Sequence, residues 1–355
     1  MNVAIVGCGR IGRVHAAAAR SQRDVGRLVL HDPGFTGTDW AAARLVGEAW
    51  AGDLDSLLDE VRPDVVHVCT PPATHAAIAI RALEAGAHVL VEKPLALSAA
   101  DGLRLGAALR PRPGALCVDH NFLFEPHVLR ARRWVAEGRI GHVFAAQAFY
   151  GIDMVPGERG PGAWALDLPG GRFTDLLPHP LYLVAHFLGE VHGVSARTAS
   201  SRPGEATSEL SALLECERGL GMVQISLASV PWELGLTLRG TAGTIRIDLA
   251  AQSATLIRPR AGSRRLALLR QTADLGLQSL ANGARRLTGK ATGRLRGYPG
   301  LRALVARFYE AVRAGLPPPV PYGDGLAVVS VMERIRLRLA TRQPASASRP
   351  LRRLA

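Results

Sequence analysis

The first 120 residues alternate short apolar runs with stretches of helical periodicity. The apolar runs predict five strands, at Val3–Val6, Leu28–His31, Val65–Cys69, His88–Glu92 and Ala115–Asp119. The stretches between them predict four helices, at Arg10–Arg20, Asp53–Glu60, Ala73–Ala85 and Ser98–Leu109. Alternation of strands and helices at this spacing predicts a doubly wound α/β domain, in which helices cover both faces of a parallel sheet.

The pattern changes after about residue 122. A helix over Pro126–Glu137 precedes a series of strands, which we predict at His142–Gly151, Val191–Ser200, Glu209–Glu215, Met222–Ala228, Leu234–Arg239 and Thr244–Leu249. Two helical segments, Phe173–Leu188 and the chain from about Leu266 onward, interrupt or follow the series. Consecutive strands without intervening helices predict an α+β domain with an open, mainly antiparallel sheet. We therefore divide the chain into residues 1–122, residues 123–340 and a basic tail, 341–355, that we expect to be disordered.

Composition places the chain among ordinary globular proteins. With 355 residues and 48% hydrophobic content, it is long enough for two cores. The N-terminus lacks the features of a signal peptide, and no run of about 18 apolar residues predicts a membrane span. The four cysteines lack a C-x-x-C spacing. They are typical of small buried side chains in a reducing cytoplasm, and we expect neither a metal site nor an extracellular location.

The net charge of +13 is concentrated near the C-terminus. Residues 258–302 carry eleven basic residues against Asp274 alone, and the chain from Arg334 onward adds seven basic residues and no acid, so the remainder has a net charge of −4. A mildly acidic body does not predict nucleic-acid binding. Within residues 258–300 an apolar stripe runs at helical spacing through Leu266, Leu269, Ala273, Leu277, Leu280, Ala284 and Leu287. We favour an inserted helix packed on its own domain or on a partner subunit; contact with an anionic membrane surface is the alternative.

A glycine motif follows the first predicted strand and opens the first predicted helix. Gly7, Gly9 and Gly12 have the G-x-G-x-x-G spacing, with Cys8, Arg10 and Ile11 between them. In a Rossmann fold these glycines form a tight turn and bring the backbone close to a dinucleotide pyrophosphate, which lies at the helix N-terminus. Asp32 ends the second strand, where a carboxylate binds the ribose hydroxyls and repels a 2′-phosphate. The motif favours NAD over NADP, and a turn before Pro33 is the alternative role of Asp32.

The only lysines are Lys93 and Lys290, among 43 basic residues. Unlike arginine, a lysine can lose its proton when burial and neighbouring cations lower its pKa, and can then act as acid or base. Lys93 directly follows the fourth predicted strand, His88–Glu92. Polar motifs follow two neighbouring predicted strands. Val65–Cys69 is followed by Thr70, Pro71, Pro72 and His75, and the next strand ends with Glu92, which Lys93 follows. Ligands bind at carboxyl ends of strands in open α/β sheets, so we expect these residues to line the cofactor site.

The order G-x-G-x-x-G, T-P-P-x-x-H and E-K-P resembles the Gfo/Idh/MocA family of oxidoreductases. Family members have a Rossmann domain followed by a domain with an open sheet, through which they commonly associate as oligomers. The resemblance implies a substrate pocket formed by Lys93 and by Asp175 and His179 of GGRFTDLLPH, four residues apart. By resemblance, Lys93 and His179 exchange a hydroxyl proton, Asp175 orients the group, and Asn121 approaches the nicotinamide, whereas His120 is structural.

This chain departs from the family pattern around His179. Pro178 and Pro180 flank it, and Tyr182 stands where many members carry a second acid. We expect a cytoplasmic NAD-dependent dehydrogenase of a sugar, polyol or nucleotide-linked sugar, forming a homo-oligomer such as a dimer or tetramer. One alternative is redox-neutral sugar chemistry with retained NAD, such as epimerisation, elimination or glycoside cleavage. The other is a non-catalytic dinucleotide-binding sensor or scaffold.

Overall fold

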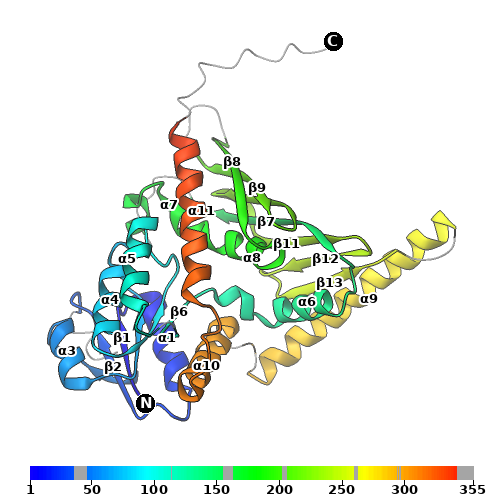
Figure 1. Cartoon of the computed structure of the whole chain (residues 1–355). Coiled ribbons are helices and arrows are strands. Elements are labelled where there is room, and N and C mark those ends of the chain that lie inside the picture. Colours follow the sequence, from blue (N-terminus) through cyan, green and yellow to red (C-terminus); the bar gives the residue numbers. More distant parts are fainter. Residues whose placement is uncertain are drawn as a thin grey trace.

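The computed structural model describes residues 1–35, 46–112, 114–154, 163–201, 206–259, 263–293, 295 and 297–341. These residues form two sheets, one near each end of the long helix α11 (Tyr322–Ala340), with a further helix projecting beyond the second sheet (Figure 1). The predicted tail at 341–355 falls outside the described residues except for Thr341. No helix of the described ranges is long and apolar enough to span a bilayer.

The first sheet is parallel throughout. Its strands are β1 (Asn2–Val6), β2 (Arg27–His31), β3 (Glu48–Ala49), β4 (Val65–Val68), β5 (His88–Val91) and β6 (Leu116–Val118), in the order β3-β2-β1-β4-β5-β6. The helices that connect them are α1 (Arg10–Arg20), α3 (Leu54–Val61), α4 (His75–Glu84) and α5 (Ala99–Leu109), with a 3-10 turn η1 (Pro72–Thr74) before α4. The predicted doubly wound sheet is confirmed. The strand order reverses between β1 and β4, which is where such sheets bind ligands.

The second sheet is mainly antiparallel. Its strands are β7 (Val143–Asp153), β8 (Val191–Ala199), β9 (Glu209–Cys216), β10 (Gly219–Ser226), β11 (Ala228–Gly240), β12 (Gly243–Asp248) and β13 (Ser253–Ile257), in the order β13-β12-β11-β7-β10-β9-β8. Among the described strand pairs of this second sheet, only β7 with β10 is parallel. The predicted fold class is confirmed. Strand β13 was not predicted.

Helices cover one face of the second sheet. They are α6 (Pro126–Ala136) and α8 (Pro178–Leu188), and the short helix α7 (Arg172–Leu176) packs against α8. The 3-10 turns η2 (Asn121–Phe124) and η3 (Ala163–Asp167) precede α6 and α7. The predicted helix over Phe173–Leu188 is therefore two helices. Proline has no N–H group to donate inside a helix but fits its first turn, and so α8 starts at Pro178.

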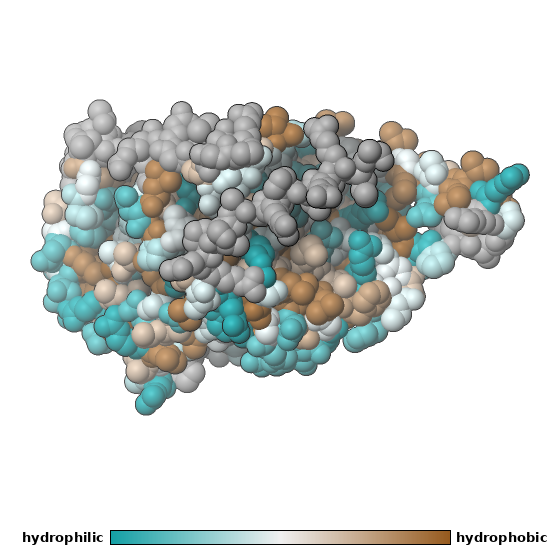
Figure 2. Space-filling view, turned by 90° about the horizontal axis from the view of Figure 1, so that it is seen from above, coloured by the Kyte–Doolittle hydropathy of each residue, from teal (hydrophilic) through white to brown (hydrophobic). Residues whose placement is uncertain are grey.

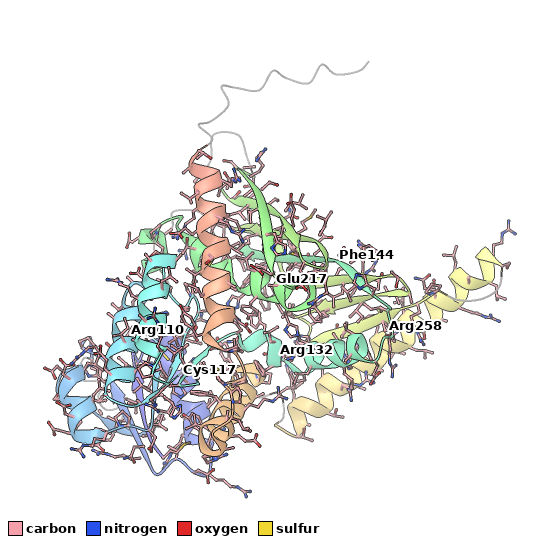
Figure 3. All side chains as sticks on the ribbon, viewed as in Figure 1. Arg110, Cys117, Arg132, Phe144, Glu217 and Arg258 are labelled. Atoms are coloured by element: carbon pink, nitrogen blue, oxygen red, sulfur yellow. The ribbon has the colours of Figure 1, made fainter. Side chains whose placement is uncertain are left out.

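The C-terminal helices connect the two sheets. Helix α10 (Pro299–Ala314) packs against α1 and η2, and α11 packs against both α5 and β8. The Val118 N–H group donates to the Val320 carbonyl oxygen at 3.1 Å, which attaches this segment to β6. In Figure 3, Cys117 lies on β6 of the first sheet and Phe144 lies on β7 of the second sheet. The first domain thus receives part of its core from residues that follow the second domain.

Candidate active site

The glycine turn between β1 and α1 has the backbone that a dinucleotide requires. Gly7 has φ +90°, and a Cβ atom there would lie 2.6 Å from the Cys69 carbonyl carbon and the Thr70 nitrogen. A Cβ atom at Gly12 would collide with the Gly7 carbonyl oxygen, whereas one at Gly9 would meet nothing within 4 Å. Gly7 and Gly12 are therefore required for packing, and Gly9 faces open space at the N-terminus of α1, where N–H groups favour an anion.

Asp32 lies beside this turn. Its Oδ2 accepts a hydrogen bond from the Cys8 N–H group at 2.7 Å, and its Oδ1 accepts one from the Gly34 N–H group at 2.9 Å. Each carboxylate oxygen has a second lone pair, so Asp32 can hold the turn and still accept from ribose hydroxyls. The arrangement fits an adenine dinucleotide whose ribose carries free hydroxyls.

The loops after β4 and β5 are joined by His75. Its Nδ1 lies 2.8 Å from the Pro94 carbonyl oxygen, and its Nε2 lies 2.8 Å from the Thr70 carbonyl oxygen. Both ring nitrogens are thus engaged, and the side chain is buried. We predicted His75 and Glu92 to line the cofactor site. In the structure both are buried supports of the loops, and Thr70, Pro71 and Lys93 remain more accessible.

A buried chain of polar side chains lies beneath Lys93. His15 Nε2 lies 2.9 Å from Glu92 Oε1 and 3.3 Å from Asp119 Oδ2, and His15 Nδ1 lies 2.9 Å from His67 Nδ1. Burial opposes protonation of His15, but the interaction with Cys69 and the hydrogen bonds to the two acids outweigh it and raise the pKa of His15. Burial, followed by the charge of Glu92, raises the pKa of Asp119 to about 7. Glu92 is therefore a buried carboxylate paired with an imidazolium, next to an acid whose pKa is raised.

Lys93 forms an ion pair with Asp175. Its Nζ lies 2.6 Å from Asp175 Oδ1 and 2.9 Å from the Asp175 carbonyl oxygen, and its side chain is 14% exposed. Burial by itself would lower the pKa of Lys93, but the charges of Asp175 and Glu92 outweigh it and raise that pKa. The prediction of a lowered pKa is wrong, because the fold brings two acids, not cations, to the lysine.

His179 is held by aromatic neighbours. Its ring stacks on Phe122 with centroids 4.4 Å apart, and its Nδ1 lies 2.9 Å from the Tyr182 hydroxyl. That hydroxyl also accepts a hydrogen bond from the Phe122 N–H group at 3.2 Å. Burial raises the pKa of Tyr182 well above its usual value, so the phenol keeps its proton. Among the described residues, the acceptor within reach of the Tyr182 hydroxyl proton is His179 Nδ1.

The hydrogen bonds of Tyr182 thereby fix the tautomer of His179. Because Nδ1 accepts, a neutral ring carries its proton on Nε2. Burial, followed by the charge of Lys93, lowers the pKa of His179 well below its usual value, so the ring is neutral. Tyr182, where the family pattern has an acid, therefore makes His179 an N–H donor. The sequence showed this residue only as a departure from the pattern.

Two further residues complete the site. Asn121 is 7% exposed, and its Oδ1 has no partner among the described residues, so it can accept from an amide such as that of a nicotinamide. His120 stacks on Tyr182 with centroids 4.3 Å apart, consistent with a structural role. Tyr150 of β7 interacts electrostatically with Lys93 and Asp175, and its ring lies 6.0 Å from that of His179. No sequence motif marks Tyr150, because only the packing of β7 against α8 brings it here.

Comparison with known proteins agrees with this geometry. Residues 1–120 match a family model described as "Oxidoreductase family, NAD-binding Rossmann fold", and residues 128–246 match "GFO/IDH/MocA C-terminal domain". A dTDP-3,4-didehydro-2,6-dideoxy-alpha-D-glucose 3-reductase of Streptomyces violaceoruber is 31% identical over 306 residues, which cover 83% of this chain and 82% of the relative. The chain belongs to the Gfo/Idh/MocA family of oxidoreductases. The prediction of an NAD-binding domain is confirmed by the first match.

Other relatives are matched over shorter segments. A levoglucosan dehydrogenase of Pseudarthrobacter phenanthrenivorans is 27% identical over 207 residues, which cover 55% of this chain and only 53% of that protein. The match thus spans about half the length of this curated relative. A solved structure of a levoglucosan dehydrogenase in complex with NADH superposes with a TM-score of 0.76 at 21% identity, covering 96% of this chain and 97% of the other. This likeness shows the shared fold.

Proposed function

We propose that the chain is an NAD-dependent dehydrogenase that interconverts a secondary alcohol and a ketone on a sugar, a polyol or a nucleotide-linked sugar. The observation that carries the proposal is the Lys93–Asp175 ion pair, whose lysine interacts electrostatically with His179 and follows a strand of the sheet that bears the glycine turn. The names of both curated relatives above refer to sugar substrates, one of them linked to dTDP. They support this substrate class.

The chain's own residues account for the proton transfer. NAD held by the glycine turn and Asp32 would supply the acceptor for the hydride of the alcohol, and NADH the hydride donor for the ketone. The Lys93 ammonium group donates a hydrogen bond to the substrate oxygen, and in ketone reduction it gives that oxygen its proton. His179 donates a second hydrogen bond from Nε2, and Asp175 holds the ammonium group in place. Two donors aimed at the oxygen stabilise the charge that develops there.

The acid–base state of Lys93 determines how the rates of alcohol oxidation and ketone reduction depend on pH. Because Asp175 and Glu92 raise its pKa, Lys93 is an ammonium ion at neutral pH and is ready to donate a proton. Alcohol oxidation requires Lys93 without its proton, so oxidation accelerates as the pH rises, whereas ketone reduction proceeds at neutral pH. Asp32 would repel a 2′-phosphate, so NAD is preferred to NADP.

We also propose a homo-oligomer that forms through the open face of the second sheet. Leu213 and Met222 face each other on β9 and β10 and are 41% and 42% exposed, and Phe144 is 45% exposed (Figure 3). Apolar patches of this kind commonly mark interfaces. The four cysteines are free thiols, which supports a cytoplasmic location.

The test is an assay of the purified chain with NAD or NADH and a panel of sugars, polyols and nucleotide sugars. We expect one substrate class to change the absorbance of the reduced nicotinamide in proportion to product. A sugar that is converted with no net change in nicotinamide would favour retained-NAD chemistry. Cofactor binding with no conversion of any sugar would favour a sensor or scaffold.

A further inference from the structure

Helix α9 (Arg264–Ala291) is the element that the proposed activity leaves unused. It has 28 residues, lies beyond the segment matched by the second family model and follows Arg258 at the edge of the second sheet (Figure 3). Its N-terminal half projects from the body of the molecule (Figure 1). The predicted helix in this basic segment is confirmed. What it can bind depends on which of its sides faces away from the protein.

The helix packs on the protein through its polar side. Gln278 pairs with both backbone groups of Leu256, accepting from the N–H group and donating to the carbonyl oxygen, each at 2.9 Å. Asn282 donates to the Ala254 carbonyl oxygen at 3.2 Å and accepts from Arg130 at 2.8 Å. These amides satisfy the outer backbone groups of β13, which would otherwise be an open sheet edge. Polar side chains, not leucines, thus hold the helix.

Most of the apolar side consequently faces away from the body, and only its margin at Leu277 borders a hollow that Trp134 and Ala254 also line. The exposed leucines on this side, with their exposed fractions, are Leu266 (42%), Leu269 (69%), Leu277 (66%), Leu280 (73%) and Leu287 (72%), whereas Leu268 (55%) is exposed on the other side of the helix. With Ala273 and Ala284 they recur at intervals of three and four residues, on the side of the helix opposite Gln278. Figure 2 shows hydrophobic residues beside hydrophilic ones at the surface of the projecting end. We call these seven residues the leucine face.

Basic residues border the leucine face. The α9 sequence contains six basic residues and one acid, Asp274, giving a net charge of +5. Arg265 and Lys290 are exposed and border one side of the leucine face. An apolar stripe bordered by cations is complementary to a bilayer that carries anionic lipids, which attract the cations while the leucines enter the headgroup boundary.

A second copy of the helix fits this face less well. A coiled coil needs apolar residues at two positions of every heptad. With Leu266, Ala273, Leu280 and Leu287 at one position, the other is held either by Leu269, Gly276, Gly283 and Lys290 or by Arg270, Leu277, Ala284 and Ala291. The first set has two glycines and a lysine, the second an arginine and two alanines, so neither fills a dimer interface well. Pairing would also bring together two helices of charge +5. A membrane needs no such knobs-into-holes packing.

We propose that α9 lies on an anionic membrane surface through its leucine face and makes this protein a peripheral membrane protein. The described helices include none that could cross the bilayer, so the contact is interfacial. The binding site for the dinucleotide lies on the other domain, so attachment leaves the cofactor cleft accessible to solvent. This inference stands independently of which substrate the enzyme turns over.

The experiment is co-sedimentation of the full chain with vesicles of phosphatidylcholine alone and of phosphatidylcholine mixed with phosphatidylglycerol. We expect binding to the anionic vesicles. This binding should weaken steeply with added salt, because salt screens the attraction between the basic side chains and the anionic lipids. The triple variant L269Q/L280Q/L287Q should bind at least about tenfold more weakly. The matched control is L103Q/L316Q/L337Q, since these leucines are 62%, 58% and 60% exposed elsewhere on the surface, and it should bind like the wild type.

Several outcomes would overturn the proposal. Wild-type protein that ignores anionic vesicles, or a leucine-face variant that still binds them fully, would do so. A change in molecular mass of that variant in sedimentation velocity, with no vesicle binding by the wild type, would assign the face to a second copy. Should the triple variant fail to fold, R265Q/K290Q should show weaker binding to the anionic vesicles alone. NADH binding, measured on the same preparations, reports the proposed function separately.

Discussion

Replacing Lys93 by methionine tests the proposed chemistry without removing the bulk of the side chain. The variant loses the ammonium group that lies 2.6 Å from Asp175 Oδ1. Removing one donor to a developing oxyanion costs about 2.7–4 kcal/mol in the transition state, or roughly 100- to 1,000-fold in kcat. Asp175 is 27% exposed and stays hydrated, so we expect the free energy of unfolding to fall by only about 1 kcal/mol. Activity should therefore fall far more than stability.

Three measurements on the same preparation separate these effects. Turnover of the preferred substrate gives kcat, urea denaturation gives the free energy of unfolding, and nicotinamide fluorescence gives the Kd for NADH, which should be nearly unchanged. Lys290→Met is the matched control, because Lys290 is the other lysine and lies exposed on α9. A Lys93→Met variant with kcat within about threefold of the wild type would refute the role of Lys93. Lys93→Arg should also lose turnover, because an arginine cannot release a proton at neutral pH.

Three further predictions follow from the same contacts. Asp175→Asn removes the nearest acid, which lowers the pKa of Lys93 and moves the alkaline rise of alcohol oxidation to lower pH; an unchanged pH–rate profile would contradict the ion pair's role. Tyr182→Phe leaves the partly buried Phe122 N–H group without its acceptor, so denaturation should show a loss of about 1 kcal/mol, and kcat should fall more than KM changes. Should KM alone change, Tyr182 would have no part in setting the His179 tautomer. Asp32→Ser should weaken NADH binding about tenfold and strengthen NADPH binding, as measured by fluorescence titration; a parallel loss for both cofactors would leave Asp32 only its turn-forming role.

The local patterns of the first domain sufficed to predict its architecture. Strand–helix alternation and the glycine spacing identify a parallel sheet with a dinucleotide turn, since both signals are encoded within about 30 residues. Strand β3 escaped prediction because Glu48–Ala49 is too short to show a period. The break between α7 and α8 coincides with Pro178, which begins α8, although the periodicity predicted one helix there.

The electrostatics of the site depended on contacts between distant segments. The sequence placed Lys93 and Asp175 in one pocket by family resemblance, but not as an ion pair, and so the direction of the lysine pKa was predicted wrongly. His75 has the position of a cofactor ligand in the motif, yet both of its nitrogens join two loops. The outward orientation of α9 was likewise invisible, because it depends on Gln278 and Asn282 meeting the edge of β13. Periodicity shows that a helix has two faces, but not which face the fold covers.

The central claim is that this chain binds NAD next to a sugar and transfers hydride between them. Titration of the purified protein with NADH and NADPH, followed by nicotinamide fluorescence before and after a panel of sugars and nucleotide sugars, tests it most directly. The account predicts tighter binding of NADH than of NADPH and a fluorescence change with one sugar class. Absence of binding by either cofactor would contradict the account and leave the glycine turn as a purely structural feature.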